Sequence, residues 1–411
     1  MRAPQYSSDP SEILSAGVIE NPDAFYARVL SECPVSRIGE TGVHLVASWA
    51  KILEVLGREE DFSANLTGVL IRGAQGQPST FDLPPTEGTK VIATADEPRH
   101  SVHRRLVKPG LSNEQIGSLE PRIRRWTRDA LSSWLLSGAG DFVPTAEILP
   151  AKVVGHLLGL PEGDAEQHRA WAMMGGEILA GDVSGPGLQN LARETAGIAE
   201  YLGEHIRLAL SGGGGPPEGS LLWRLALGVG EGEVSLSEAT GIAIVMFGAG
   251  GESTSALIGS SVKLLAESAS LVRRLRESPE LIPRFVEEAV RLEPPFKFHY
   301  RAVRRKCELD GYALAPGDRL MLHWAAANRD PSIYAGPNEI QLDRKYPKHH
   351  LSFGRGAHFC VGEQIARLEG RIMIEELLRC PGEFALDSGD PPVYARSIFV
   401  RRLERLPIAV E

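Results

Sequence analysis

The chain is poor in aromatic residues, has only four cysteines among its 411 residues, and carries no excess of basic charge. Its 44 lysines and arginines face 53 acidic residues, so the net charge of -9 gives no basic field for nucleic acid or an anionic membrane. The cysteines form no CxxC pair, which predicts reduced thiols rather than disulfides. The first ten residues show neither a signal-peptide core nor a membrane anchor. We therefore expect a globular, cytoplasmic protein that does not bind nucleic acid.

Helical periodicity dominates the middle of the chain. Apolar residues recur every three or four positions over 121–136 and 192–210, and a glycine-rich loop follows at 211–219. Strand-like alternation is confined to four short patches: 43–47, 307–314, 319–323 and 397–400. The pattern predicts a mainly α protein with small β-sheets at its edges.

The longest predicted helix covers about 235–265 and begins at a capping box formed by Ser235 and Glu238. Three glycines near its centre, each costing up to ~1 kcal/mol relative to alanine, are followed by Glu252, Ser253 and Thr254. Two explanations stay open. Another helix packs closely over the glycines beside a solvated glutamate, or a ligand approaches the backbone next to a carboxylate and two hydroxyls.

Cys360 lies in a glycine-rich loop directly before a helix that is predicted to begin at Glu363. The helix dipole and uncovered backbone N–H groups stabilise a thiolate there, as a metal-ligating sulfur requires. Two alternatives stay open at this point. One is an inert buried cysteine, and the other is a zinc site formed with His349, His350 and His358.

The segment 353–362 (FGRGAHFCVG) resembles the FGxGxHxCxG cysteine loop of the cytochrome P-450 superfamily of haem-thiolate monooxygenases. Four more segments resemble family motifs and follow in the family's order: the HxxxR pair His100 and Arg104, the oxygen-binding segment AGGEST at 249–254, the ExxR pair Glu288 and Arg291, and NRDP at 328–331. The length and the anchorless start look like those of soluble bacterial members.

The resemblance implies the cytochrome P-450 fold as a single domain over 1–411, with haem b between the long central helix and the cysteine loop. It implies Cys360 as the iron ligand. Further cofactor-binding residues are implied at His100, Arg104, Ala249, Gly250, Arg301, Phe353, Gly354, His358 and Gly362. Four of these, the two histidines and the two arginines, would face the haem propionates.

Catalytic and substrate-binding residues follow from the same resemblance. Glu252, Ser253 and Thr254 would deliver protons, and because serine stands where the family usually has threonine, we expect less tight coupling. The family topology places several segments at the substrate pocket: 62–95, about 170–195, 296–299 and 397–399. The individual residues expected there are Phe247, Phe296, Phe298, His299, Ile398 and Phe399.

The implied reaction inserts one atom of dioxygen into a small hydrophobic substrate, by hydroxylation or epoxidation, in natural-product metabolism. We expect a monomer that receives electrons from ferredoxin and ferredoxin reductase on a basic surface near the cysteine: Arg104, Arg105, Lys108, Arg122, Arg125 and Arg355. The alternatives are a haem-thiolate peroxygenase or a coupling or dehydrogenation enzyme, and a non-catalytic haem- or ligand-binding protein.

Overall fold

The computed structural model describes residues 9–83, 90–136, 138, 140–182, 185–380 and 382–410. Its α-helices are α1 (Ala16–Glu20), α2 (Asp23–Glu32), α3 (Trp49–Leu56), α4 (Arg99–Val107), α5 (Asn113–Leu136), α6 (Val143–Leu158), α7 (Ala165–Ala172), α8 (Gly185–Ser211), α9 (Leu221–Gly230), α10 (Leu236–Ala266), α11 (Ala269–Glu277), α12 (Ile282–Leu292), α13 (Trp324–Ala327) and α14 (Glu363–Arg379). Short 3-10 helices are η1 (Pro10–Leu14), η3 (Ile92–Thr94), η4 (Lys108–Leu111), η5 (Glu162–Asp164), η6 (Glu177–Leu179), η7 (Pro279–Leu281) and η8 (Gly356–His358).

The strands are short and form small sheets, as predicted. They are β1 (Val35–Arg37), β2 (Val43–Val46), β3 (Phe62–Ser63), β4 (Gly68–Arg72), β5 (Pro78–Asp82), β6 (Gly140–Asp141), β7 (His299–Val303), β8 (Cys307–Leu309), β9 (Tyr312–Leu314), β10 (Arg319–Leu322), β11 (Phe384–Leu386), β12 (Val393–Tyr394), β13 (Leu403–Arg405) and β14 (Pro407–Val410). The largest sheet has the order β1-β2-β10-β7-β3; β2 and β10 run parallel, whereas its other neighbours run antiparallel.

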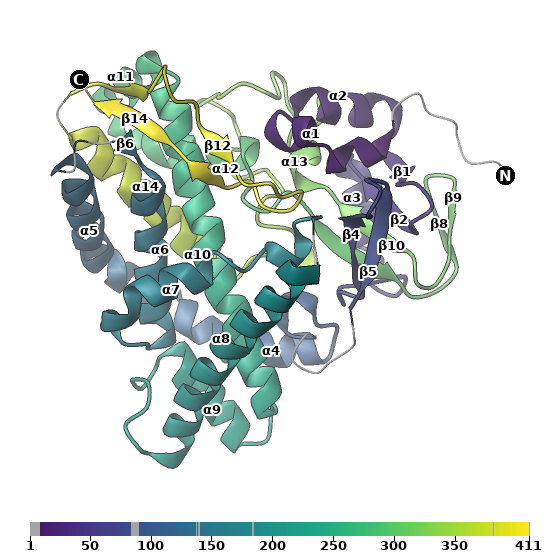
Figure 1. Ribbon diagram of the computed structural model, residues 1–411, viewed down its shortest axis with the longest axis horizontal. Helices are drawn as coiled ribbons and strands as arrows, with labels where there is room; N and C mark the ends of the chain where they lie inside the picture. Colours follow the sequence, from purple (N-terminus) through teal and green to yellow (C-terminus); the bar gives the residue numbers. More distant parts are fainter. Residues whose placement is uncertain are drawn as a thin grey trace.

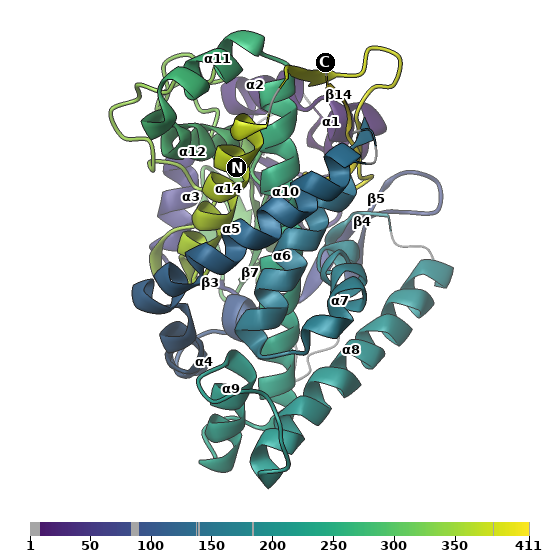
Figure 2. The same ribbon diagram turned by 90° about the vertical axis from the view of Figure 1, so that its left-hand side faces the viewer.

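Helices α5 to α9 and the main sheet occupy different sides of the molecule. The five-stranded sheet, the β4–β5 hairpin and α1 to α3 gather on one side, and α5 to α9 lie on the other (Figure 1). Helix α10 runs through the middle of the helical part and packs against α6, α7, α8 and α14 (Figure 2). The predicted mainly helical fold with small sheets is therefore confirmed.

The predicted capping box at the start of α10 is confirmed. Ser235 Oγ accepts from the Glu238 N–H at 3.1 Å, and Glu238 Oε2 accepts from the Ser235 N–H at 2.9 Å. By length and composition α10 is apolar enough to cross a membrane, but 67% of its most apolar window is buried inside the fold. Burial of this kind is typical of a core helix.

The glycines of α10 allow close approach of other backbone. A Cβ atom on Gly251 would lie 2.3 Å from the Cβ of Ala172, and one on Gly248 would lie 3.1 Å from the Cα of Gly175. The close-packing explanation therefore holds for the glycines, because α7 and the segment after it fill the space that side chains would need. Its second part is wrong, since Glu252 is 3% exposed rather than solvated.

The prediction of a strand over 397–400 is wrong. Ser397 Oγ accepts from the N–H groups of Phe399 at 3.1 Å and Val400 at 3.0 Å, so a local turn satisfies them instead of a neighbouring strand. Val400 makes an isolated bridge to Phe296. The helix patterns at 121–136 and 192–210, by contrast, lie within α5 and α8.

Candidate active site

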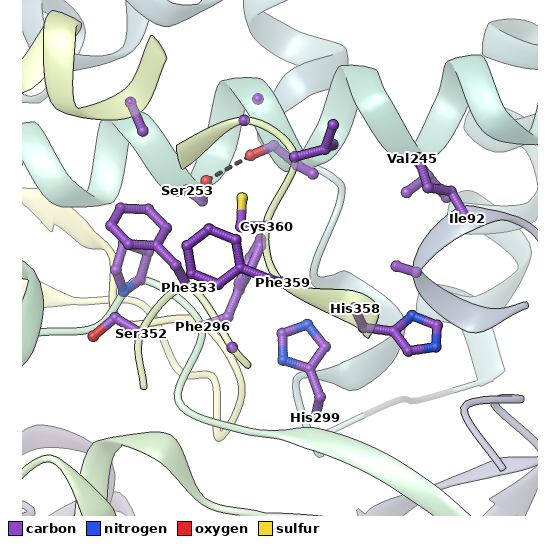
Figure 3. A pocket seen from close by; sticks show the side chains of 18 of the residues that line it. Ile92, Val245, Ser253, Phe296, His299, Ser352, Phe353, His358, Phe359 and Cys360 are labelled. Atoms are coloured by element: carbon purple, nitrogen blue, oxygen red, sulfur yellow. Dashed lines mark hydrogen bonds between the residues drawn. The ribbon is translucent and has the colours of Figure 1, made fainter. Parts of the chain in front are cut away.

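A cavity lies between the middle of α10 and the cysteine loop (Figure 3). Its wall includes all ten residues predicted to hold the cofactor or iron: His100, Arg104, Ala249, Gly250, Arg301, Phe353, Gly354, His358, Cys360 and Gly362. It also includes four of the residues predicted for catalysis or substrate binding: Ser253, Thr254, Phe296 and His299. Segments far apart in the sequence thus meet at one cavity.

The loop that carries Cys360 is held by its own backbone. Gly354 and Gly356 have φ values of +68° and +76°, which non-glycine residues rarely adopt. The Cys360 N–H donates to the Phe353 carbonyl at 2.8 Å. These turns present the sulfur to the cavity immediately before α14 begins at Glu363, the residue predicted from the sequence.

Burial raises the pKa of the Cys360 thiol above its ordinary value. The backbone N–H of Gly362 and the cations of Arg367 and Arg104 oppose this effect without overcoming it. One backbone N–H group therefore assists ionisation, as expected from the sequence, but a positive metal ion would be the decisive partner for the thiolate.

Cationic and donor groups gather at one end of the cavity. The rings of His100 and His358 lie 4.1 Å apart, and Arg301 is 8% exposed, with one donor engaged by the Tyr300 carbonyl at 2.8 Å. His100 Nε2 and His358 Nδ1 are buried without a hydrogen-bond partner among the described residues. Burial lowers the pKa of Arg301 to about 10, and burial with Arg301 nearby lowers that of His358 to about 3.

Buried ring nitrogens that can donate and lack a partner, beside the Arg301 cation, fit an anionic ligand. Together with Arg104, whose guanidinium donates to the Phe359 carbonyl at 2.8 Å, this end of the cavity suits a group with two carboxylates. Cys360 provides a soft ligand for its metal. The residues present therefore fit haem b.

The hydroxyl-bearing residues of α10 lie on the cavity wall, whereas Glu252 does not. Ser253 Oγ donates to the Ala249 carbonyl at 2.5 Å, and Thr254 is 3% exposed. Glu252 points toward the segment after α7, and its Oε1 lies 3.4 Å from Arg402 Nε. Burial raises the pKa of Glu252 to about 7 despite the nearby Arg402 guanidinium.

His299 is the polar member of the wall next to Phe296. The indole N–H of Trp324 donates to His299 Nδ1 at 2.8 Å. Burial lowers the pKa of His299 to about 4, so the ring is neutral, and because Nδ1 accepts, its proton sits on Nε2. The ring therefore offers an N–H donor.

Four residues predicted for the substrate pocket lie outside the cavity wall, because their side chains pack into the core: Phe247, Phe298, Ile398 and Phe399. Phe247 meets the ring of His168 at 5.7 Å, and Ile398 would contact any Cβ placed on Gly181. Phe399 stacks on Phe296 at 4.6 Å, so it supports the wall from behind.

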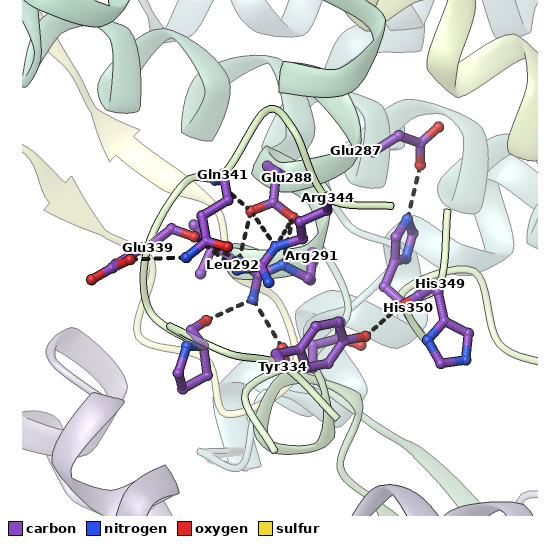
Figure 4. Close-up of polar contacts among 12 residues, drawn as sticks. Glu287, Glu288, Arg291, Leu292, Tyr334, Glu339, Gln341, Arg344, His349 and His350 are labelled. Carbon is purple, nitrogen blue, oxygen red and sulfur yellow. Dashed lines mark hydrogen bonds and ion pairs between the residues drawn. The ribbon is translucent and has the colours of Figure 1, made fainter. Parts of the chain in front are cut away.

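The ExxR pair is fully buried. Glu288 and Arg291 are both 0% exposed and are joined by two hydrogen bonds of 2.8 and 2.9 Å, as expected (Figure 4). Arg344 also binds Glu288, at 3.0 Å. Sequence analysis missed Arg344, because no fixed spacing connects it to Glu288, which lies 56 residues earlier.

The predicted zinc alternative is not supported. His350 is bound to Glu287, and His349 packs on Trp49 with ring centroids 4.7 Å apart. In the described part of the chain, no group of three or more His, Cys, Asp or Glu side chains is arranged to hold a metal ion.

Other wall residues were missed by sequence analysis. Val245 and Met246 precede Ala249 by one helical turn, so helical periodicity could have found them. Ile92 and Ala93, by contrast, lie within the segment 62–95 that the resemblance places at the pocket. Glu369 also reaches the wall, and burial raises its pKa well above the ordinary value; no local motif marks it.

Comparisons with known proteins agree with this geometry. The Cytochrome P450 family model matches residues 226–385. The chain is 37% identical to cytochrome P450 144 of Mycobacterium tuberculosis, over 98% of this chain and 92% of that protein, and 31% identical to erythromycin C-12 hydroxylase of Saccharopolyspora erythraea, over 89% of each. Among solved structures it is similar to CalO2, with a TM-score of 0.85 and 27% identity over 99% of both chains. The chain therefore belongs to the cytochrome P450 family and is a monooxygenase with haem b as its cofactor.

Proposed function

We propose that this enzyme hydroxylates or epoxidises a small, mostly apolar molecule in natural-product metabolism. The observation that carries the proposal is a cavity with Cys360 and cationic donors on one side and an apolar stretch of α10 on the other. The erythromycin C-12 hydroxylase and the 6-deoxyerythronolide B hydroxylase among its relatives support a natural-product substrate.

Cys360 would hold the haem iron, and His100, Arg104, Arg301 and His358 would bind the propionates. When bound, the haem supplies the activation of dioxygen that no side chain can perform. The protein's own contribution is a fixed thiolate ligand, neutralisation of two carboxylates, and a wall that excludes water.

Protons would enter through α10. Because the pKa of Glu252 is about 7, its carboxyl exchanges protons readily near neutral pH. The hydroxyls of Ser253 and Thr254, next in sequence and on the cavity wall, would pass them inward. While Ser253 Oγ donates to the Ala249 carbonyl, its lone pairs remain able to accept.

The substrate would contact Ile92, Val245, Met246 and Phe296, which are apolar, and His299 Nε2–H would bind a carbonyl or hydroxyl oxygen. A ferredoxin and its reductase would supply electrons to a cytoplasmic monomer that forms one domain over 1–411. Exposed Lys108, directly after α4, would suit an acidic partner.

A spectroscopic comparison tests the iron ligand. Haem-loaded wild type should show the red-shifted absorption of a reduced carbon-monoxide complex with a thiolate ligand, and Cys360→Ser should lose it, because a hydroxyl is a poor substitute for thiolate. Cys307→Ser, on a strand outside the cavity wall, is the matched control and should keep it. An unchanged spectrum in Cys360→Ser would remove Cys360 as the ligand.

Isotope labelling tests the reaction. Compounds that shift the haem absorption on binding should be turned over with ferredoxin, reductase and NADPH under ¹⁸O₂, and we expect one labelled oxygen atom per product. Product without label, or turnover that proceeds only with hydrogen peroxide, would favour the peroxygenase or coupling alternatives.

A further inference from the structure

A second buried ion-pair cluster lies beside the cysteine loop, separate from the ExxR pair. Its centre is Glu287 on α12, which is 4% exposed. Glu287 Oε2 is 2.9 Å from His350 Nε2 (Figure 4), and the Arg367 guanidinium donates to the same carboxylate through Nε at 2.6 Å and Nη2 at 3.2 Å. His350 precedes the loop and Arg367 follows it on α14, so one carboxylate ties both ends of the loop together.

Arg367 also covers the aromatic ring at the start of the loop. Its guanidinium carbon lies 4.4 Å from the centroid of Phe353, within the range of a cation–π contact. The Phe353 carbonyl in turn accepts a hydrogen bond from the Cys360 N–H, and both residues line the cavity. The cation is therefore connected to the sulfur ligand through one ring and one backbone bond.

Arg367 places its positive charge against the Phe353 ring, whose own residue is one backbone hydrogen bond from Cys360. A cation at this position favours negative charge on the sulfur. Glu287 and Glu363 on the first turn of α14 both pair with the guanidinium and partly offset its charge. The Arg367 and Glu287 side chains are only 17% and 5% exposed, so solvent screens them weakly.

We propose that Arg367 is a positioning residue whose charge, balanced by Glu287, sets the reduction potential of the iron bound by Cys360. This proposal rests on the proposed role of Cys360. The step concerned adds one electron, supplied by the ferredoxin or by a chemical reductant, and takes iron from ferric to ferrous with no bond formed or broken. The reduced centre is more negative by one charge, so a nearby cation favours it and a nearby carboxylate opposes it.

Opposite charge changes test this. Arg367→Gln should lower the midpoint potential by about 59 mV, a tenfold change in the one-electron equilibrium. Glu287→Gln should raise it, and the double variant should return toward wild type. Arg371→Gln is the matched control: it lies one turn further along α14, pairs with Glu120 and Glu375, and should leave the potential unchanged. The measurement is a mediated spectroscopic redox titration of the haem-loaded protein.

The outcomes separate this inference from the proposed function. A wild-type protein without the red-shifted carbon-monoxide band would remove the iron ligand itself. If the band is present but Arg367→Gln and Glu287→Gln move the potential in the same direction, or not at all, the inference is wrong and the proposed function stands. If Arg367→Gln binds no haem, two other variants still test the inference. Arg367→Lys should keep a midpoint potential near that of wild type, and Glu287→Gln should have a higher one.

Discussion

Burial and the nearby Arg402 cation have opposite effects on the pKa of the Glu252 carboxyl group. Burial is the larger effect, so the pKa rises from its ordinary value of 4.5 to about 7. Below pH 4.5 the group is protonated in both the folded and the unfolded chain. Between pH 4.5 and about 7 the unfolded chain ionises freely while the folded chain resists, so stability contributed by this group is lost as pH rises through that window.

The Glu252→Gln variant should therefore gain stability relative to wild type as pH increases. Because one pKa unit corresponds to 1.36 kcal/mol, the difference in the free energy of unfolding should grow by about 3 kcal/mol between pH 4.5 and 7, then stay level. Urea unfolding at constant ionic strength measures it. Glu166→Gln, whose side chain is 77% exposed, is the control and should show no such trend. A flat difference for Glu252→Gln would contradict the raised pKa.

The two hydroxyls that follow Glu252 differ in their surroundings. Ser253 Oγ is bound to the Ala249 carbonyl, whereas Thr254 is more deeply buried on the same wall. We expect Ser253→Ala to keep haem and substrate binding but to form less product per NADPH consumed, with the remaining electrons found as hydrogen peroxide. Thr254→Ala and the double variant show whether the neighbour compensates. Wild-type product yield in all three variants would exclude both hydroxyls from proton delivery.

At the scale of the element, α10 combines a long apolar helix with glycines at the places where α7 crosses it. The capping box and apolar pattern predicted its existence and its ends, because both signals are local. The contact partners of its glycines could not be predicted, since Ala172 and Gly175 lie more than 70 positions away and carry no motif. The strand predicted over 397–400 does not form, because the Ser397 hydroxyl accepts hydrogen bonds from the N–H groups of Phe399 and Val400. The alternating pattern does not reveal this competition.

A pair of alanine substitutions in α10 separates these effects. In Gly251→Ala the new Cβ would lie 2.3 Å from Ala172 Cβ, and overpacking of this kind costs ~1–3 kcal/mol. In Gly259→Ala the nearest atom is Leu403 Cδ1 at 3.7 Å, an ordinary contact, so helix propensity should stabilise the protein by up to ~1 kcal/mol. Urea unfolding should thus show a lower free energy of unfolding for Gly251→Ala and a higher one for Gly259→Ala. If Gly251→Ala were more stable than wild type, α7 would be able to move aside at little cost, and the prediction would be wrong.

At the scale of the whole molecule, the active site is an assembly of short motifs from distant segments. The cysteine loop, the HxxxR pair and the ExxR pair could be found in the sequence because each is a compact pattern. Their supporting charges could not: Arg344 reaches Glu288, and Arg402 reaches Glu252, only through the tertiary fold. The substrate wall was predicted least well, because which phenylalanines face the cavity depends on how loops pack over α10.

Exposed basic residues lie within the cysteine loop and directly after α4, in a chain whose net charge is -9. Arg104 ties α4 to the loop through the Phe359 carbonyl, Lys108 follows α4 directly, and Arg355 lies within the loop. Lys108 and Arg355 are both exposed, whereas Arg105 is paired with Glu233 at 2.8 Å. Exposed cations at these positions would favour encounter with the proposed acidic ferredoxin.

Reversal of these charges should slow electron transfer in a salt-dependent way. Lys108→Glu and Arg355→Glu should each lower the rate of reduction by an acidic ferredoxin at low ionic strength, in stopped-flow measurements. The gap from wild type should close near 1 M salt, because the Debye length falls from ~10 Å at 0.1 M to ~3 Å. Arg273→Glu makes the same change of charge at an exposed residue of α11, which lies at the opposite end of the molecule from α4 (Figures 1 and 2). It should have little effect on the rate of reduction. Equal slowing in all three variants would mean that the ferredoxin senses net charge rather than this surface.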